Sequence, residues 1–191
     1  MKLTEFARKP LVLYLLKFFA LFCIAYYGTI AVEGVAAPGN LYFPFVEKYL
    51  NYPSWLRATL LWGTKTLLSL FGYHMNIPNA YHIQVVGGKT VQLIYECLGV
   101  GVMSFWFAFV LANRGAWKKK LSWLFGGLLL LWFINVCRIS LLIVAIDKGQ
   151  DRIFGLDNHD FFNICAYIAI FIMIFLYDRK IFKKQPSTAE G

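Results

Sequence analysis

The sequence contains few cysteines, few histidines and few acidic residues. It has four cysteines, three histidines and ten acidic residues among 191 positions. The cysteine spacing matches no zinc or haem pattern and implies no disulfide framework, and nothing in the sequence indicates a metal or an organic cofactor. Three of the cysteines lie inside apolar stretches, where cysteine is commonly a small inert hydrophobic residue. Cys97 alone follows a polar segment and precedes an apolar one, which makes it the cysteine to consider for chemistry.

Acidic residues are outnumbered by basic ones, and the net charge is +9. Such a charge can indicate nucleic-acid binding, but most of the basic residues here flank apolar stretches, so no nucleic-acid partner is expected. Hydrophobic residues make up 59% of the chain, and Phe, Tyr and Trp together supply 18%. With a mean hydropathy of +0.58, this composition indicates a membrane protein in contact with lipid.

The apolar runs predict an all-α membrane protein that forms a single integral membrane domain over residues 1–191. About four transmembrane helices are expected, together with an interfacial amphipathic helix and a short extracytoplasmic β-hairpin. The expected spans cover residues 11–35, 98–112, 121–146 and 161–177, and a polar tail follows over residues 178–191.

Residues 54–72 are predicted to form the interfacial helix. Ser54, Arg57, Thr64 and Lys65 fall within about a third of a helical wheel, and both cations would enter the hydrocarbon if the segment crossed the membrane. The segment before it, residues 36–53, holds three prolines and is predicted to be a loop at the interface.

The hairpin is predicted over residues 81–96, where two β-rich runs flank Gly87-Gly88. Such a hairpin must lie outside the hydrocarbon or against protein.

Charge asymmetry predicts the orientation of the four spans. Eleven basic residues in segments 2–9, 114–120 and 179–184 lie on one side, and six basic residues lie on the other. We therefore expect a multi-pass protein of the plasma (inner) membrane with both termini in the cytoplasm.

Three residues, Cys97, Arg138 and His159, then lie at or near the outer ends of different spans. A Cys97 thiolate at a helix N-terminus would be favoured by the helix dipole. Arg138 would lie about 12 Å inside its span at 1.5 Å per residue, where a charge costs about 2.5 kcal/mol or more, and such residues commonly serve a function. Asn135, three residues earlier on the same face, is expected to hold its guanidinium.

A thiol, an imidazole and a fixed cation suit acyl transfer on a substrate in the membrane. The histidine takes the thiol proton, the thiolate attacks a peptide carbonyl, and the arginine stabilises the oxyanion. Other interpretations stay open: Cys97 as a packing residue, Arg138 as a structural cation paired with Glu33 or Glu96, and His74 or His82 in place of His159.

The segments Cys97-Leu98-Gly99 and Asn135-Val136-Cys137-Arg138, with His159 opening the last core helix, resemble the exosortase/archaeosortase family of membrane cysteine transpeptidases. The resemblance covers roughly residues 80–177. It implies Cys97 as nucleophile, Arg138 and His159 as further catalytic residues, and supporting roles for Asn135 and Gly99, all on the extracytoplasmic face. It also implies substrates, namely exported proteins whose C-terminus carries a short motif, a transmembrane helix and a basic tail, to be transferred to a cell-surface acceptor.

The competing hypothesis is a non-enzymatic membrane assembly or scaffold subunit in which Arg138 is a structural pairing residue. A transporter or channel subunit has little support, because the sequence shows no internal repeat. The sequence leaves open the recognition motif, the acceptor and the oligomeric state.

Overall fold

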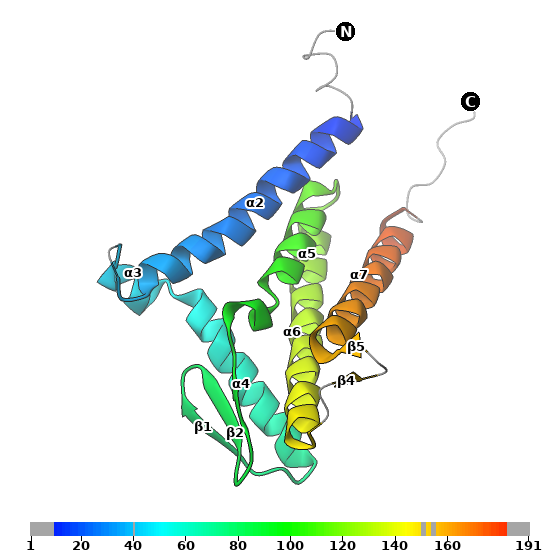
Figure 1. Ribbon diagram of the computed structural model, residues 1–191. Helices are drawn as coiled ribbons and strands as arrows, with labels where there is room; N and C mark the ends of the chain where they lie inside the picture. Colours follow the sequence, from blue (N-terminus) through cyan, green and yellow to red (C-terminus); the bar gives the residue numbers. More distant parts are fainter. Residues whose placement is uncertain (1–9, 40, 150–151, 154–155, 183–191) are drawn as a thin grey trace, which may run out of the picture.

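The computed structural model describes the backbone of residues 10–39, 41–149, 152–153 and 156–182 (Figure 1). Side chains are described for residues 11–39, 41–149, 164, 166–177 and 179. The fold is mostly helical, as predicted. The helices are α2 (Pro10–Ala36), α3 (Pro44–Tyr49), α4 (Tyr52–Leu70), the 3₁₀ helix η1 (Tyr95–Leu98), α5 (Val100–Ala112), α6 (Trp117–Asp147) and α7 (Asn158–Phe182).

Within the described residues, two helices are long and apolar enough to cross a membrane, Leu11–Ala36 and Trp117–Asp147. Val100–Ala112 and Ala166–Tyr177 are shorter apolar helices. Each predicted span thus falls on a helix, while the number of crossings stays a prediction. Helix α7 continues beyond the predicted span as far as Phe182, so the first residues of the expected polar tail are helical.

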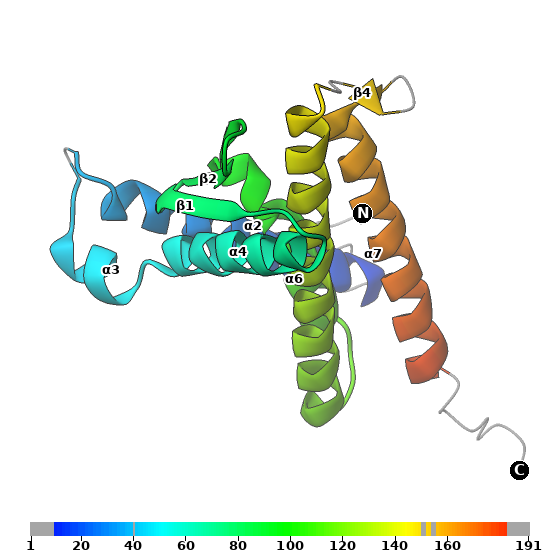
Figure 2. The ribbon, with the colours of Figure 1, turned by 90° about the horizontal axis from the view of Figure 1, so that it is seen from below.

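Helix α6 is the central element, and the other long helices pack around it or around α5 (Figure 1). Helix α2 packs mainly on α5, and α7 lies along α6. Helix α4 crosses α6 (Figure 2). A Cβ at Gly63 of α4 would lie 2.9 Å from Cγ2 of Val136, so the absence of a side chain there allows the two helices to approach closely.

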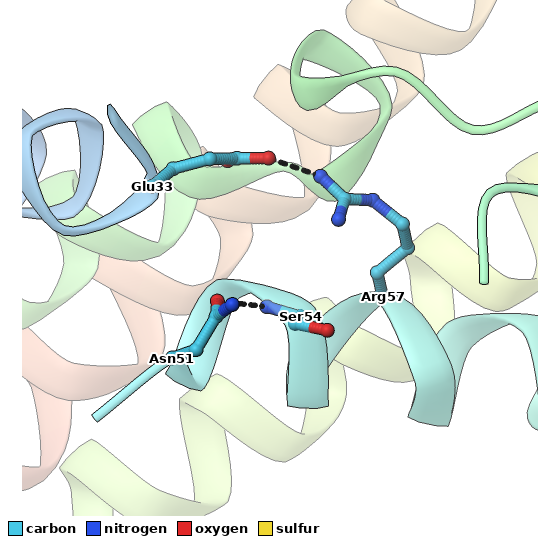
Figure 3. A network of polar contacts seen from close by, with 4 residues as sticks. All are labelled: Glu33, Asn51, Ser54 and Arg57. Atoms are coloured by element: carbon cyan, nitrogen blue, oxygen red, sulfur yellow. Dashed lines mark hydrogen bonds and ion pairs between the residues drawn. The ribbon is translucent and has the colours of Figure 1, made fainter. Parts of the chain in front are cut away.

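The predicted interfacial segment is a helix, α4, and its place in the membrane interface stays a prediction. Its polar residues do not all face outward, since Arg57 is 3% exposed and Thr64 is fully buried. The reason is a partner on α2: the Arg57 guanidinium forms an ion pair with Glu33 (Figure 3). The same guanidinium lies 4.4 Å from the centre of the Tyr81 ring. Glu33, considered above as a partner for Arg138, is therefore the partner of Arg57.

Helix α4 begins at a capped turn. The Asn51 side chain accepts a hydrogen bond from the backbone N–H of Ser54 at 3.1 Å, which satisfies one of the free donors of the first turn (Figure 3). Residues 36–53 were expected to be a loop throughout, but they also contain the short helix α3, which begins at Pro44.

The predicted hairpin is present as β2 (His82–Val85) and β3 (Thr90–Gln92), antiparallel with Ile83 opposite Val91. It is shorter than predicted, because the chain turns into η1 at Tyr95. A further strand, β1 (Met75–Asn79), pairs with β2 and was not predicted. A second small sheet, β4 (Arg152–Ile153) with β5 (Leu156–Asp157), precedes α7.

The apolar core joins the sheet to the helices that carry the site. Buried side chains from α4, the first sheet, η1 and α6 form one continuous cluster; among them are Leu60, Ile83, Leu93, Leu98 and Ile143. Cys97 packs against this cluster. The cluster therefore fixes the segment before α5 relative to the middle of α6.

Candidate functional site

Cys97 lies in η1, a single 3₁₀ turn between the sheet and α5. Its backbone N–H donates to the carbonyl of Ile94 at 2.9 Å, and its side chain is half-buried. The sequence placed Cys97 directly before the second span. The structure separates the two, because Gly99 interrupts the helical path and α5 begins at Val100.

Gly99 is required at this junction for two reasons. Its φ of +71° lies in the left-handed region, which other residues adopt at a cost. A Cβ at this position would also lie 3.3 Å from Nδ2 of Asn135 on α6. The glycine therefore both turns the chain from η1 into α5 and allows the Asn135 amide to come close.

Asn135 joins α6 to the backbone of the candidate nucleophile. Its Nδ2 donates to the carbonyl oxygen of Cys97 at 2.9 Å, and the residue is 6% exposed. The sequence predicted that Asn135 would hold the guanidinium of Arg138. That contact stays a prediction. The hydrogen bond that the amide donates goes to Cys97, 38 residues away along the chain. Because the amide is buried, this bond restrains the residue that carries the thiol.

Arg138 lies one helical turn beyond Asn135 on α6 and is half-buried. Its guanidinium lies within electrostatic range of Cys97. The structure thus brings together four of the five predicted site residues: Cys97, Gly99, Asn135 and Arg138.

His159 is the second residue of α7, as the sequence predicted from its position at the start of the last helix. Its side chain lies outside the described residues, so its place relative to Cys97 stays a prediction. Of the two other histidines, His74 is exposed. Nδ1 of His82 lies 2.8 Å from Oδ1 of Asn79, in the turn between β1 and β2.

Tyr95 was missed by sequence reasoning, although it stands only two residues before Cys97. Its hydroxyl is buried and has no hydrogen-bond partner among the described residues. Burial, with smaller contributions from nearby groups including Tyr26 and Glu33, raises the pKa of Tyr95 to about 12. The phenol is therefore neutral at physiological pH, and it lies within electrostatic range of Glu33 on α2.

The arrangement can support nucleophilic chemistry. It provides a thiol on a short restrained turn, a cation within electrostatic range of that thiol, and an amide that fixes its backbone. Among the described residues, no group of three or more His, Cys, Asp or Glu side chains is placed to hold a metal ion.

Comparison with known proteins gives one match. No curated protein and no solved structure is significantly similar to the chain. The family model of the transmembrane exosortase matches residues 8–176, which is most of the chain and includes Cys97, Asn135, Arg138 and His159. Together with the long apolar helices, the match shows a membrane protein. The chain belongs to the transmembrane exosortase family.

Proposed function

We propose that this protein is a membrane-embedded cysteine transpeptidase. It cleaves exported proteins within a C-terminal sorting signal and transfers them to an amine-bearing acceptor at the cell surface. The observation that supports the proposal best is the hydrogen bond from Asn135 to the Cys97 carbonyl, because it holds the thiol beside the helix face that carries Arg138.

The proposed reaction has two steps. His159 takes the proton of the Cys97 thiol, the thiolate attacks the scissile carbonyl carbon, and Arg138 stabilises the oxyanion. The peptide C–N bond then breaks, the leaving amine takes the proton from His159, and a thioester on Cys97 remains. In the second step the acceptor amine attacks the thioester carbonyl carbon and gives a proton to His159. A new amide bond forms, the C–S bond breaks, and His159 returns the proton to the Cys97 thiolate.

We propose four membrane crossings, by α2, α5, α6 and α7, with both termini in the cytoplasm. The site then faces the extracytoplasmic side, at the outer end of α5. The hydrogen bond to Asn135 places Cys97 beside the middle of α6, twelve residues before its end at Asp147. At 1.5 Å per residue, about 18 Å of α6 extends beyond the site, together with α4 and the sheet that pack there.

Replacement of the nucleophile tests the proposal. Cys97→Ala and Cys97→Ser are expected to leave the protein inserted and abundant but to abolish processing of a co-expressed reporter. The reporter is a single-span protein from the same genome that ends in a short motif, an apolar helix and a basic tail. Cys23→Ala, which removes an exposed thiol on α2, is the matched control and should process normally. Unchanged processing by the Cys97→Ala variant would refute the proposed enzymatic activity.

A further inference from the structure

An apolar groove lies between α2 and α7, with α5 as its floor. Its volume is about 440 Å³. Figure 1 shows α2 and α7 on either side of α5, diverging from it. The residues that matter most for its shape are Phe22 and Tyr26 of α2, Gly101 and Phe105 of α5, and Tyr167 and Phe171 of α7.

One end of the groove lies next to the candidate site. Gly101 on its floor follows Cys97 by four residues along the chain, just beyond the turn at Gly99. Tyr26 on its wall packs against the same apolar cluster as Cys97, and a Cβ at Gly101 would lie 3.7 Å from the Tyr26 ring. An elongated apolar molecule in the groove would therefore have one end at the thiol.

We infer that this groove binds the apolar helix of the sorting signal, with the N-terminal end of that helix at Cys97. The inference rests on the proposed function. It adds the place where the substrate is held and the direction in which it lies.

The dimensions of the groove suit a helix. On α7 the lining extends from Tyr167 to Ile174, seven residues or about 10 Å, which is two turns of a docked helix. Aromatic rings on both walls, with glycine on the floor, form a surface into which side chains at i, i+3 and i+7 can pack while the backbones approach. Tyr167 and Phe171 remain 55% and 71% exposed, so the α7 wall still has apolar surface to bury.

Chain direction also favours this occupant. In a sorting signal the cleaved bond precedes the helix. A helix running parallel to α5 therefore places that bond at Cys97 and continues down the groove. A lipid acyl chain would fill the same volume but would bring no peptide bond to the thiol.

Filling the groove tests the inference. Gly101→Phe should lower the rate of reporter processing about tenfold or more, because its ring occupies the floor where the helix must pack. Alkylation of Cys97 by iodoacetamide, followed on the Cys97 peptide by mass spectrometry, should remain within about twofold of wild type, since the reagent is small. Gly126→Phe on α6, where an added Cβ meets nothing within 4 Å, is the matched control and should process normally.

Photo-crosslinking gives a second test that does not depend on turnover. A photoreactive phenylalanine analogue at Phe171, in the Cys97→Ala background, should crosslink to the apolar helix of the co-expressed reporter. The same analogue at Phe125 of α6, which is 66% exposed and lies outside the groove, should not.

The outcomes separate this inference from the proposed function. Normal processing by Gly101→Phe, or crosslinks from position 171 to lipid alone, would overturn the groove assignment even if Cys97 forms a thioester. Processing by Cys97→Ala would refute the proposed function, whichever residues crosslink.

Discussion

The hydrogen bond from Asn135 to the Cys97 carbonyl gives the sharpest mutational prediction. Asn135→Leu keeps a side chain of similar size but removes the donor, which leaves the Cys97 carbonyl without its observed side-chain partner. Losing a neutral hydrogen bond costs about 0.5–1.5 kcal/mol, and an unsatisfied buried carbonyl costs about 1–3 kcal/mol. We expect the free energy of unfolding to fall by about 1–3 kcal/mol.

The effect on activity should be larger than this loss of stability implies. The bond acts on the same residue that carries the thiol, and a displacement of about 1 Å at a reacting group can cost about 100-fold in rate. We therefore expect a 10- to 100-fold fall, roughly, in the rate of reporter processing per inserted folded molecule. The measurement is the initial rate in membranes, normalised to protein that remains folded in a thermal-shift assay.

Ser140→Ala is the matched control. Ser140 is on the buried side of α6 too, but its hydroxyl donates only to the Val136 carbonyl of its own helix, at 2.8 Å. It should keep nearly full activity. Wild-type activity per folded molecule in Asn135→Leu would show that the bond does not position the nucleophile, and an equal loss in Ser140→Ala would indicate general packing damage.

Five further substitutions follow from the same structure. Gly99→Ala should destabilise the protein by about 1–2 kcal/mol and reduce processing, because of its positive φ and the approach of Asn135; a denaturation curve showing no change would contradict this. Arg138→Lys should lose most processing, since a point charge does not replace a planar guanidinium, and full activity would make the arginine structural. Glu33→Gln and Arg57→Met should each lower the free energy of unfolding by about 2–4 kcal/mol, which is less than for a fully buried pair because Glu33 keeps 26% exposure. The double variant should lose less stability than the sum of the two single variants, and strict additivity would exclude the ion pair. Tyr95→Phe should change stability by less than about 1 kcal/mol at pH 7, because the hydroxyl has no described partner. The raised pKa of Tyr95 favours the folded state below pH 10, and this contribution is lost as the pH rises to about 12, so the variant should lose less stability than the wild type over that range. Identical alkaline titrations of the two proteins would contradict the burial of the hydroxyl.

The helices could be predicted from the sequence because their signal is local. Long apolar runs define α2 and α6, and the glycine pair at residues 87–88 locates the β2–β3 turn. Strand β1 gave no comparable signal, since Pro78 and two asparagines within it disfavour a strand. It forms because β2 offers an edge with which it can pair.

The direction in which polar side chains face could not be predicted from the sequence. A helical wheel shows that Arg57 and Thr64 share a face of α4, but not whether water or protein meets that face. Arg57 faces protein because its partner, Glu33, lies 24 residues earlier on another helix. Similarly, spacing places Asn135 and Arg138 on one side of α6, while the turn at Gly99 decides that the amide meets the Cys97 carbonyl.

The candidate site could be predicted in part, since membrane depth is readable from sequence. Cys97 and Arg138 were expected at or near the outer ends of different spans, and the structure places them within electrostatic range. Tyr95 was not identified because an aromatic residue before a span is common in membrane proteins. Its burial arises only when η1 folds against the cluster formed by α4, α6 and the sheet.

The central claim is that the Cys97 sulfur forms an acyl bond with the substrate. The direct measurement is to trap the reporter on the enzyme by rapid acid quenching in the absence of an added acceptor, and to identify the attached peptide by mass spectrometry. We expect a hydroxylamine-sensitive thioester that joins Cys97 to a reporter fragment, and the last residue of that fragment should be the one at the cleaved bond of the sorting signal. A reporter cleaved at the wild-type rate with no adduct on Cys97, or with the adduct on another cysteine, would contradict it.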